Sequence, residues 1–349
     1  MVTRVPAAGL AGYLERLYRA AGMSGDDAAA MADAHVEADL RGIPGHGSRL
    51  APVYLGKLRD GRLSPRPRIT PVRTVGACLV ADADLAPGPV AARHAVGASV
   101  ELARRHGTGL VIVRRAGHAG ALGTAATRAA EQGLAVVLAT PASSASVALL
   151  GGTGTPLLGN SALAVALPSP DFGQPVVLDM AASSISWGRV HHRARTGQAL
   201  PDGCALDAAG RPARDPREAA ALLPAGERGQ AAVIVLQALL AALAGTAPLP
   251  DGTEGRGLLS LAIDPALLGA AGLAAATETI SRAVRGQGAR MPGDRSWAHR
   301  SAVLRDGIEL DDADLAALTA AGQPDIPAPP EWAAPHPAQP ITTAKEILP

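Results

Sequence analysis

Cysteine and charge of one sign are both in short supply in this chain of 349 residues, and each shortage excludes a class of protein. The two cysteines, Cys78 and Cys204, lie far apart and lack the spacing of metal ligands, which argues against a disulfide framework and against a zinc site. Lys and Arg (32 residues) nearly balance Asp and Glu (31 residues), so no net field would hold nucleic acid or an anionic membrane. We therefore expect a small-molecule partner, no nucleic acid and no membrane.

A hydrophobic run long enough to cross a bilayer is also missing. The longest run, residues 231–245, contains Gln237 and is too short for a span, so it predicts a buried helix. The first twenty residues carry charges within their apolar stretch, which is typical of an amphipathic helix and not of a secretory signal. Together with the scarce cysteine, this pattern predicts a cytoplasmic protein.

What is present is an alternation of two hydrophobic periods, which predicts an α/β fold with some parallel strand pairing. The expected strands are 78–85, 109–115, 134–140, 162–168, 176–180 and 257–264. The expected helices are 6–21, 26–40, 89–107, 121–132, 183–190, 230–244, 266–287 and 311–321. Ser24 is a candidate N-cap for the second helix. Residues 191–229 read as a surface excursion, and the proline-rich tail from Gly322 as an extended, disordered or neighbour-wrapping segment.

Two histidines lie where imidazoles are useful for proton transfer. His46 stands between two glycines just after a helix, where a flexible backbone can turn the ring into a cavity; the competing interpretation is a surface histidine. His118 follows a strand, at the edge where open α/β sheets bind ligands, and Gly120 follows it in the same turn. Neither this turn nor residues 151–156 match a dinucleotide or P-loop fingerprint.

Charged side chains near these segments have two interpretations each. Arg49 can bind a carboxylate with two hydrogen bonds, or stand solvated in its loop. Asp179 ends an apolar strand and either orients an imidazole or caps the next helix. The arginines that could meet phosphates, or simply face water, are Arg228, Arg290, Arg295 and Arg300.

Five segments in order resemble the malate/L-lactate dehydrogenase family of the second type, which includes ureidoglycolate and sulfolactate dehydrogenases and the pyrroline- and piperideine-2-carboxylate reductases. They are AHVEADLRGIPGHG, AGHAGALG, VVLDMAASSISWGRV, LLPAGERG and ARMPGDRSWAHR, and they span nearly the whole chain. The resemblance implies a non-Rossmann mixed sheet that binds NADH or NADPH, at residues 76–287. It also implies a helical domain from both termini, at 1–75 and 288–349, and a homodimer with the active site near its interface.

The resemblance also implies roles for single residues. His46 matches a proton donor to a carbonyl or imine, His118 a residue at the nicotinamide and substrate, and Asp179 a member of the proton relay. Substrate contacts are implied for Arg49, Tyr54 and Asn160. Cofactor contacts are implied for His118, Gly120, Ser183, Arg228, Arg290, Gly293 and Arg295.

The chain departs from the family where the substrate would bind. The family pattern places serine at 45 and arginine at 50, and this chain has Gly45 and Leu50, with Arg49 one position early. The expected function is reduction or oxidation of a small 2-oxo, 2-hydroxy or cyclic 2-imino acid with NAD(P)H and His46 as proton donor. Two alternatives stay open: a non-redox acid/base reaction such as cyclisation or elimination, and a catalytically silent binding subunit.

Overall fold

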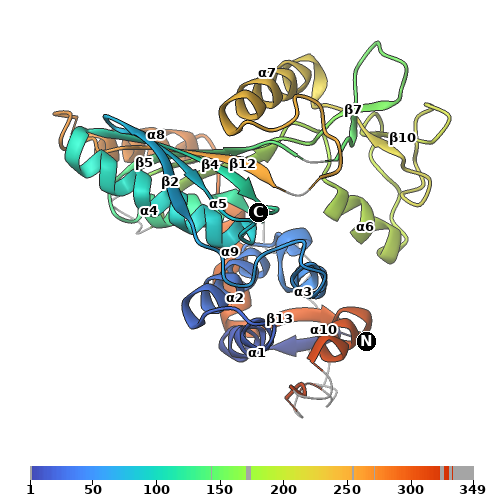
Figure 1. Ribbon diagram of the computed structural model, residues 1–349. Coiled ribbons are helices and arrows are strands. Elements are labelled where there is room, and N and C mark those ends of the chain that lie inside the picture. The colour runs from blue at the N-terminus through green and yellow to red at the C-terminus, as the bar shows by residue number, and fades with distance from the viewer. Residues whose placement is uncertain are drawn as a thin grey trace.

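A seven-stranded mixed sheet forms the centre of the computed structural model, which describes residues 2–142, 144–169, 174–253, 255–270, 272–322, 326–329 and 332 (Figure 1). In spatial order its strands are β2 (Thr70–Val75), β3 (Cys78–Asp82), β4 (Thr108–Ala116), β12 (Arg256–Ile263), β5 (Ala135–Thr140), β8 (Ala162–Leu167) and β9 (Val176–Ala181). Only β3 and β4 pair in parallel within this sheet, and its other neighbours are antiparallel. The mixed α/β prediction is confirmed, and β9 is left as an edge strand.

Helices cover both faces of this sheet. Helices α4 (Gly88–His106) and α5 (Leu122–Ala130) pack on one face, and α7 (Gly226–Ala244) packs on the other (Figure 1). The prediction that residues 231–245 form a buried helix is wrong, because only the face with Val233, Gln237 and Leu240 is covered. By length and composition α7 could cross a membrane, yet only 33% of its most apolar window is buried. Apolar residues on the outer face are Ile234, Val235, Leu239 and Leu243.

The two ends of the described chain meet in a second lobe (Figure 1). Strand β1 (Val2–Val5) pairs antiparallel with β13 (Ile308–Asp311), and helices α1 (Ala7–Ala20), α2 (Gly25–Leu40), α3 (Ala51–Arg59), α9 (Asp294–Asp306) and α10 (Asp312–Gly322) gather around them. Ser24 caps α2 as expected, accepting a hydrogen bond from the Asp27 N–H. The domain boundaries at 75/76 and 287/288 stay a prediction; β2, at residues 70–75, is paired with β3 in the large sheet.

The start of the proline-rich tail folds back on its own chain. The Trp332 ring meets the Tyr13 ring edge-on, with 5.0 Å between centroids. Residues 333–349, which carry most of the expected tail, lie outside the described residues.

A smaller sheet extends from the end of the large one. It contains β6 (Val147–Ala148), β7 (Pro156–Leu158), β10 (Ala205–Leu206) and β11 (Ala221–Leu222). The helix expected at 183–190 is shifted: Ser186 caps α6, which runs Trp187–Thr196. Residues 191–229 are therefore more than a surface excursion, since Val190, Leu200 and Leu222 share a separate small core. One further helix, α8 (Leu273–Gly286), follows β12 in the chain.

Candidate functional site

The structure brings the two predicted histidines together. His46 ends a short 3₁₀ turn (Pro44–His46), and His118 lies two residues beyond the end of β4. Their rings stack with centroids 5.2 Å apart and an interplanar angle of 21°. Two segments distant in sequence, one from each lobe, thus place imidazoles side by side.

Tyr54 of α3 fixes the ring of His118. Its hydroxyl lies 2.8 Å from Nδ1 of His118 and 2.7 Å from the His118 carbonyl oxygen. These contacts use the Nδ1 side of the ring, so Nε2 is the nitrogen that remains to meet a substrate. The predicted substrate contact of Tyr54 stays a prediction, and what the structure shows is its contact with His118.

Both imidazoles are held towards the neutral form. Burial lowers the pKa of His118 well below its usual value, and the nearby charges of His46 and Arg256 lower it further. Burial also lowers the pKa of His46. Neutral rings at pH 7 suit groups that accept and return a proton, and two cationic rings in stacking contact would repel each other.

Asp179 is linked to α5 and lies in the exposed edge strand β9. Its carboxylate accepts a hydrogen bond of 2.9 Å from the Gly123 N–H, in the first turn of α5. A Cβ at position 123 would come within 2.8 Å of that carboxylate, so any larger residue there would displace the Asp179 side chain. The predicted capping of the next helix is wrong, because Ser186 caps α6 and Asp179 instead binds the first turn of the preceding helix α5. The relay role stays a prediction. Desolvation by the surrounding protein raises the pKa of the Asp179 carboxyl, and the hydrogen bond from the Gly123 N–H opposes that rise.

Arg49 is already paired with a carboxylate of its own chain. Its Nε binds Oδ2 of Asp314 in α10, and Arg195 of α6 binds the other oxygen of the same carboxylate at 3.1 Å. The Asp314 side chain is only 6% exposed. Nε of Arg49 is thus taken by Asp314, and in the structure Arg49 connects the His46 loop to α10 and, through the shared Asp314, to α6.

Several of the predicted cofactor residues lie near the two ends of the exposed edge strand β9. At its start, Pro292 accepts a hydrogen bond from the Val177 N–H, and Gly293, at φ +96°, packs against Val177. At its end, the Ser183 N–H donates to the Asn160 side chain at 3.1 Å. Exposed arginines flank the strip, with Arg290 and Arg295 near its start and Arg228 in the first turn of α7. Arg300 is instead paired with Glu37 of α2, at 3.0 Å.

Sequence reasoning missed two residues that contact the His46 loop. His35 and Asp39 lie one turn apart on α2 and are buried, with 1% and 7% of their surface exposed. Nδ1 of His35 is 3.2 Å from the His46 carbonyl oxygen, and Asp39 accepts a 2.8 Å hydrogen bond from the Ser48 N–H. The available signal was a pair of polar residues at i and i+4 on an otherwise apolar helix face.

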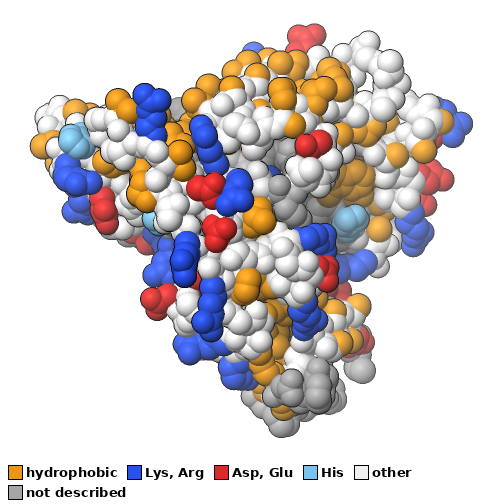
Figure 2. Space-filling model, viewed as in Figure 1, with side chains coloured by type: hydrophobic (Ala, Val, Ile, Leu, Met, Phe, Trp, Pro, Cys, Tyr) orange, Lys and Arg blue, Asp and Glu red, His pale blue; other side chains and the backbone are white. Residues whose placement is uncertain are grey.

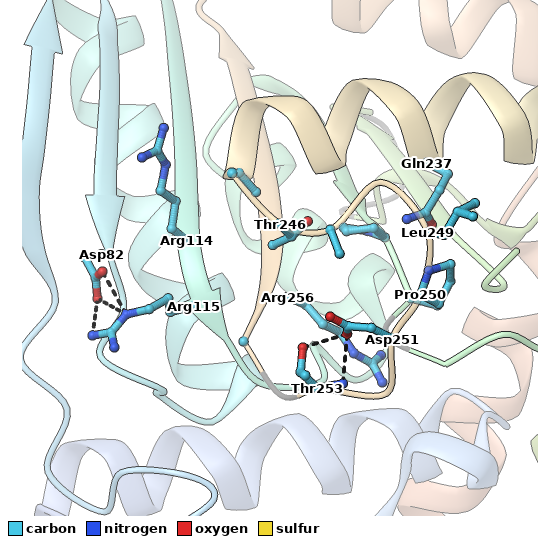
Figure 3. Close-up of a pocket in the computed structure, with 16 residues that line it drawn as sticks. Asp82, Arg114, Arg115, Gln237, Thr246, Leu249, Pro250, Asp251, Thr253 and Arg256 are labelled. Atoms are coloured by element: carbon cyan, nitrogen blue, oxygen red, sulfur yellow. Dashed lines mark hydrogen bonds and ion pairs between the residues drawn. The ribbon is translucent and has the colours of Figure 1, made fainter.

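A cavity of about 460 Å³ lies beside the C-terminal end of β4 (Figure 3), and neither His46 nor His118 is among the residues that line it. Its lining includes the end of β4, the start of β12 and the loop that follows α7. Arg256, which faces this cavity, pairs with Ala116 two residues before His118. Arg115, which also lines the cavity, donates two hydrogen bonds to the carboxylate of Asp82. On the visible face, the molecule is hollowed between the part that carries α7 and the lobe below it, and Lys/Arg and His side chains border the hollow (Figure 2).

Comparison with known proteins identifies the family of this chain. The family model described as malate/L-lactate dehydrogenase matches residues 5–319. The chain belongs to the malate/L-lactate dehydrogenase family. Within the described residues of this family member, no group of three or more His, Cys, Asp or Glu side chains could hold a metal ion.

Relatives in this family carry several dehydrogenase and reductase names. The chain is 31% identical over 323 residues to the Δ¹-pyrroline-2-carboxylate/Δ¹-piperideine-2-carboxylate reductase of Pseudomonas syringae pv. tomato, covering 87% of this chain and 92% of that one. It is 33% identical over 230 residues to malate dehydrogenase of Pyrococcus abyssi (65% of this chain, 62% of that one). The corresponding match to L-sulfolactate dehydrogenase of Methanocaldococcus jannaschii is 32% over 223 residues (63% and 64%), so these last two matches span less than two thirds of the relatives' lengths.

Solved structures of the family share the fold over almost the whole chain. The crystal structure of a dehydrogenase from Sinorhizobium meliloti superimposes with a TM-score of 0.85 at 31% identity, covering 92% of this chain and 98% of that one. The Δ¹-piperideine-2-carboxylate reductase of Pseudomonas syringae superimposes with a TM-score of 0.80 at 29% identity, covering 91% and 99%.

Proposed function

We propose that this protein is an oxidoreductase that transfers hydride between NADH or NADPH and a small 2-oxo, 2-hydroxy or cyclic 2-imino acid. The observation that carries the proposal is the stacked pair of His46 and His118, with centroids 5.2 Å apart. One imidazole can protonate the substrate oxygen or nitrogen while its neighbour holds the same group by a hydrogen bond. We assign the proton to His46 because Tyr54 already fixes His118 through Nδ1.

The residues along β9 fit a nicotinamide dinucleotide. The strand edge is exposed, with Leu178 and Met180 accessible, and a left-handed turn at Gly120 (φ +72°) precedes the start of α5. N–H groups at a helix start and flanking cations such as Arg228 and Arg295 suit phosphates. When bound, the nicotinamide supplies or accepts the hydride. Gly120, Ser183 and the arginines would hold the dinucleotide, and His118 would stand at the reacting end.

The lowered pKa of His46 bears on the direction of reaction. A neutral imidazole at pH 7 is ready to accept a proton, as oxidation of a 2-hydroxy acid requires. Reduction requires the protonated ring, so its rate should rise as the pH falls towards the pKa of His46. Oxidation should show the opposite slope.

Two measurements test the function in sequence. Titration with NADH and with NADPH, followed by nicotinamide fluorescence, should show binding and identify the preferred cofactor. Absorbance at the nicotinamide band should then change with one member of a substrate panel. Malate, L-lactate and sulfolactate are tested with the oxidised cofactor, and Δ¹-pyrroline-2-carboxylate and Δ¹-piperideine-2-carboxylate with the reduced cofactor. No interaction with either cofactor up to millimolar concentration would refute the redox proposal and leave a non-redox or silent protein.

A homodimer in the cytoplasm completes the proposal. The outer face of α7 carries four apolar side chains, Ile234, Val235, Leu239 and Leu243, which are between 37% and 62% exposed. A contiguous exposed apolar face of this kind is typical of an interface, and a second copy of this chain is the partner we propose.

A further inference from the structure

The loop that carries His46 is held by its backbone. Helix α2 presents His35 and Asp39 to it from one face, and their hydrogen bonds reach the His46 carbonyl oxygen and the Ser48 N–H. These two bonds lie on either side of Gly47. We call the pair His35 and Asp39 the α2 clamp.

The proton positions on His35 follow from its partners. A carbonyl oxygen can only accept, so Nδ1 of His35 donates to His46, and Nε2 of the neutral ring must accept from the Tyr18 hydroxyl 2.8 Å away. Burial supports both assignments, because it lowers the pKa of His35 to about 4 and raises the pKa of Tyr18 well above its usual value. The chain of donors from Tyr18 through His35 to the His46 carbonyl is thus fixed at neutral pH.

The two glycines beside His46 admit the elements that hold it. A Cβ at Gly47 would overlap the Asp39 carboxylate, and a Cβ at Gly45 would come within 3.0 Å of the Gly188 Cα in α6. His46 is therefore held between α2 on one side and the start of α6 on the other. His35 also touches the second half of the site, since its ring meets the Tyr54 ring edge-on with 5.3 Å between centroids.

The imidazole of His46 itself receives no such support. Its Nδ1 is buried, and nothing in the described part of the chain hydrogen-bonds to it. Position 45, from which the resemblance would supply a serine hydroxyl, is glycine here. Support through the backbone is what remains to place the ring against His118.

We propose that the α2 clamp positions His46: His35 and Asp39 set the ring of His46 against His118 by fixing the backbone on both sides of Gly47. Both are positioning residues, because neither side chain reaches the reacting atoms. The catalytic part of this inference rests on the proposed function, and the placement of the ring does not.

The first test compares His35→Leu with His35→Asn. Leucine cannot donate to the His46 carbonyl, whereas the asparagine amide can take the place of Nδ1. We expect His35→Leu to lower kcat by about 10- to 100-fold, as misplacement of a catalytic group does, with little change in KM or in NAD(P)H affinity. His35→Asn should recover most of kcat.

The second readout needs no activity. Titration of the His46 ring, followed by NMR, should give a pKa below the ordinary value in the wild type and in His35→Asn. In His35→Leu it should move up towards 6.5, because the released ring becomes solvated. The ionisable groups on the elements around His46 include His118, Tyr54, His35, Asp39, Arg49, and the histidines and arginines of α6. Only His35 differs between these variants, so the His35→Asn spectrum controls for the loss of the His35 ring.

A second pair of variants keeps the test decisive if His35→Leu does not fold. Tyr18→Phe removes the donor to Nε2 and should shift kcat and the His46 titration in the same direction by a smaller amount. Tyr13→Phe, a buried tyrosine of the same helix that bonds only backbone carbonyl oxygens of the C-terminal segment, should change neither. If kcat and the His46 titration stay at wild-type values in His35→Leu, or in Tyr18→Phe should the first not fold, the inference is overturned. Failure of the wild type to bind NAD(P)H would refute the proposed function alone, because the titration would still decide the placement of His46.

Discussion

The hydrogen-bond partners of individual side chains show which nitrogen atoms at the candidate site are already occupied. Tyr54 occupies Nδ1 of His118, and Asp314 occupies Nε of Arg49. By contrast, the buried Nδ1 of His46 has no hydrogen-bond partner among the described residues. This contrast makes His46 the residue whose removal should affect the chemistry and little else.

Replacement of His46 by alanine should lower the rate of turnover by about 10²- to 10⁴-fold, the usual contribution of a general acid or base. Cofactor affinity should change little, since Ser183, Gly293 and the predicted arginines lie near β9 and His46 is not among the predicted cofactor residues. Steady-state kinetics and a fluorescence titration measure the two quantities. His106→Ala, at an exposed position at the end of α4, is the control. A variant that retains the wild-type rate would remove His46 from the proton-donor role.

The α2 clamp also predicts an unusual dependence of stability on pH. Burial lowers the pKa of His35 from 6.5 to about 4, so its neutral form stabilises the fold above pH 6.5 and that contribution is lost as the pH falls towards 4. Burial raises the pKa of Asp39 from 3.8 to about 6, so its ionised form costs stability above pH 6 and that cost disappears as the pH falls towards 3.8. Each change amounts to about 3 kcal/mol, at 1.36 kcal/mol per pKa unit, and the two have opposite signs.

The two contributions should therefore nearly cancel in the wild type between pH 6.5 and 4. Asp39→Asn should lose stability more steeply over that interval than the wild type, and His35→Leu should lose it less steeply. Urea unfolding at a series of pH values measures the slopes. Parallel slopes for all three proteins would show that these groups titrate as they do in the unfolded chain.

At the level of elements, α6 is joined to the His46 loop by a contact between two glycines. A Cβ at Gly188 would come within 2.8 Å of the Gly45 Cα, and both atoms belong to backbone that cannot rotate away. Further along α6, Arg195 shares Asp314 with Arg49. Movement of α6 would thus be passed to the catalytic loop at two points.

Gly188→Ala should push α6 away from the loop and destabilise the protein by about 1–3 kcal/mol, the usual cost of overpacking. It should also lower kcat/KM. Gly97→Ala is a matched control, because Gly97 lies in α4 with nothing within 4 Å of its Cβ position, and alanine there should be neutral or slightly stabilising. Equal melting temperatures and kinetics for the two variants would contradict a tight contact between α6 and the loop.

The whole molecule shows which properties the sequence could predict. Periodicity located most of the sheet and its helices, because each of these elements has a local hydrophobic pattern. Strands β1 and β13 escaped, since four residues give no period and their partner lies at the other end of the chain. Helix α7 was assigned to the core because it is apolar on two faces, and composition does not distinguish a core from an interface.

The sequence likewise predicted some residues of the candidate site and missed others. The motifs identified His46 and His118, and the structure stacks them. The α2 clamp was not predicted, because its partners are a carbonyl oxygen and an N–H, which every residue has. The partner of Arg49 was missed because Asp314 is remote in sequence.

The exposed face of α7 predicts the assembly state. The wild type should run as a dimer in size-exclusion chromatography with light scattering, and Val235→Glu, at a side chain that is 62% exposed, should halve the mass. A carboxylate buried in an apolar interface without a partner is costly, whereas the same side chain in water is not. Val72→Glu, on the exposed strand β2, is the control. A monomeric wild type would contradict the homodimer.

The pairing of β1 with β13 has a consequence for biosynthesis. A ribosome releases Val2–Val5 first and must translate beyond residue 311 before those four residues find their partner. Asp314, which neutralises Arg49, emerges later still. The nascent chain can therefore complete its large sheet once β12 has been translated, whereas the loop bearing His46 acquires its contact with Asp314 only after that.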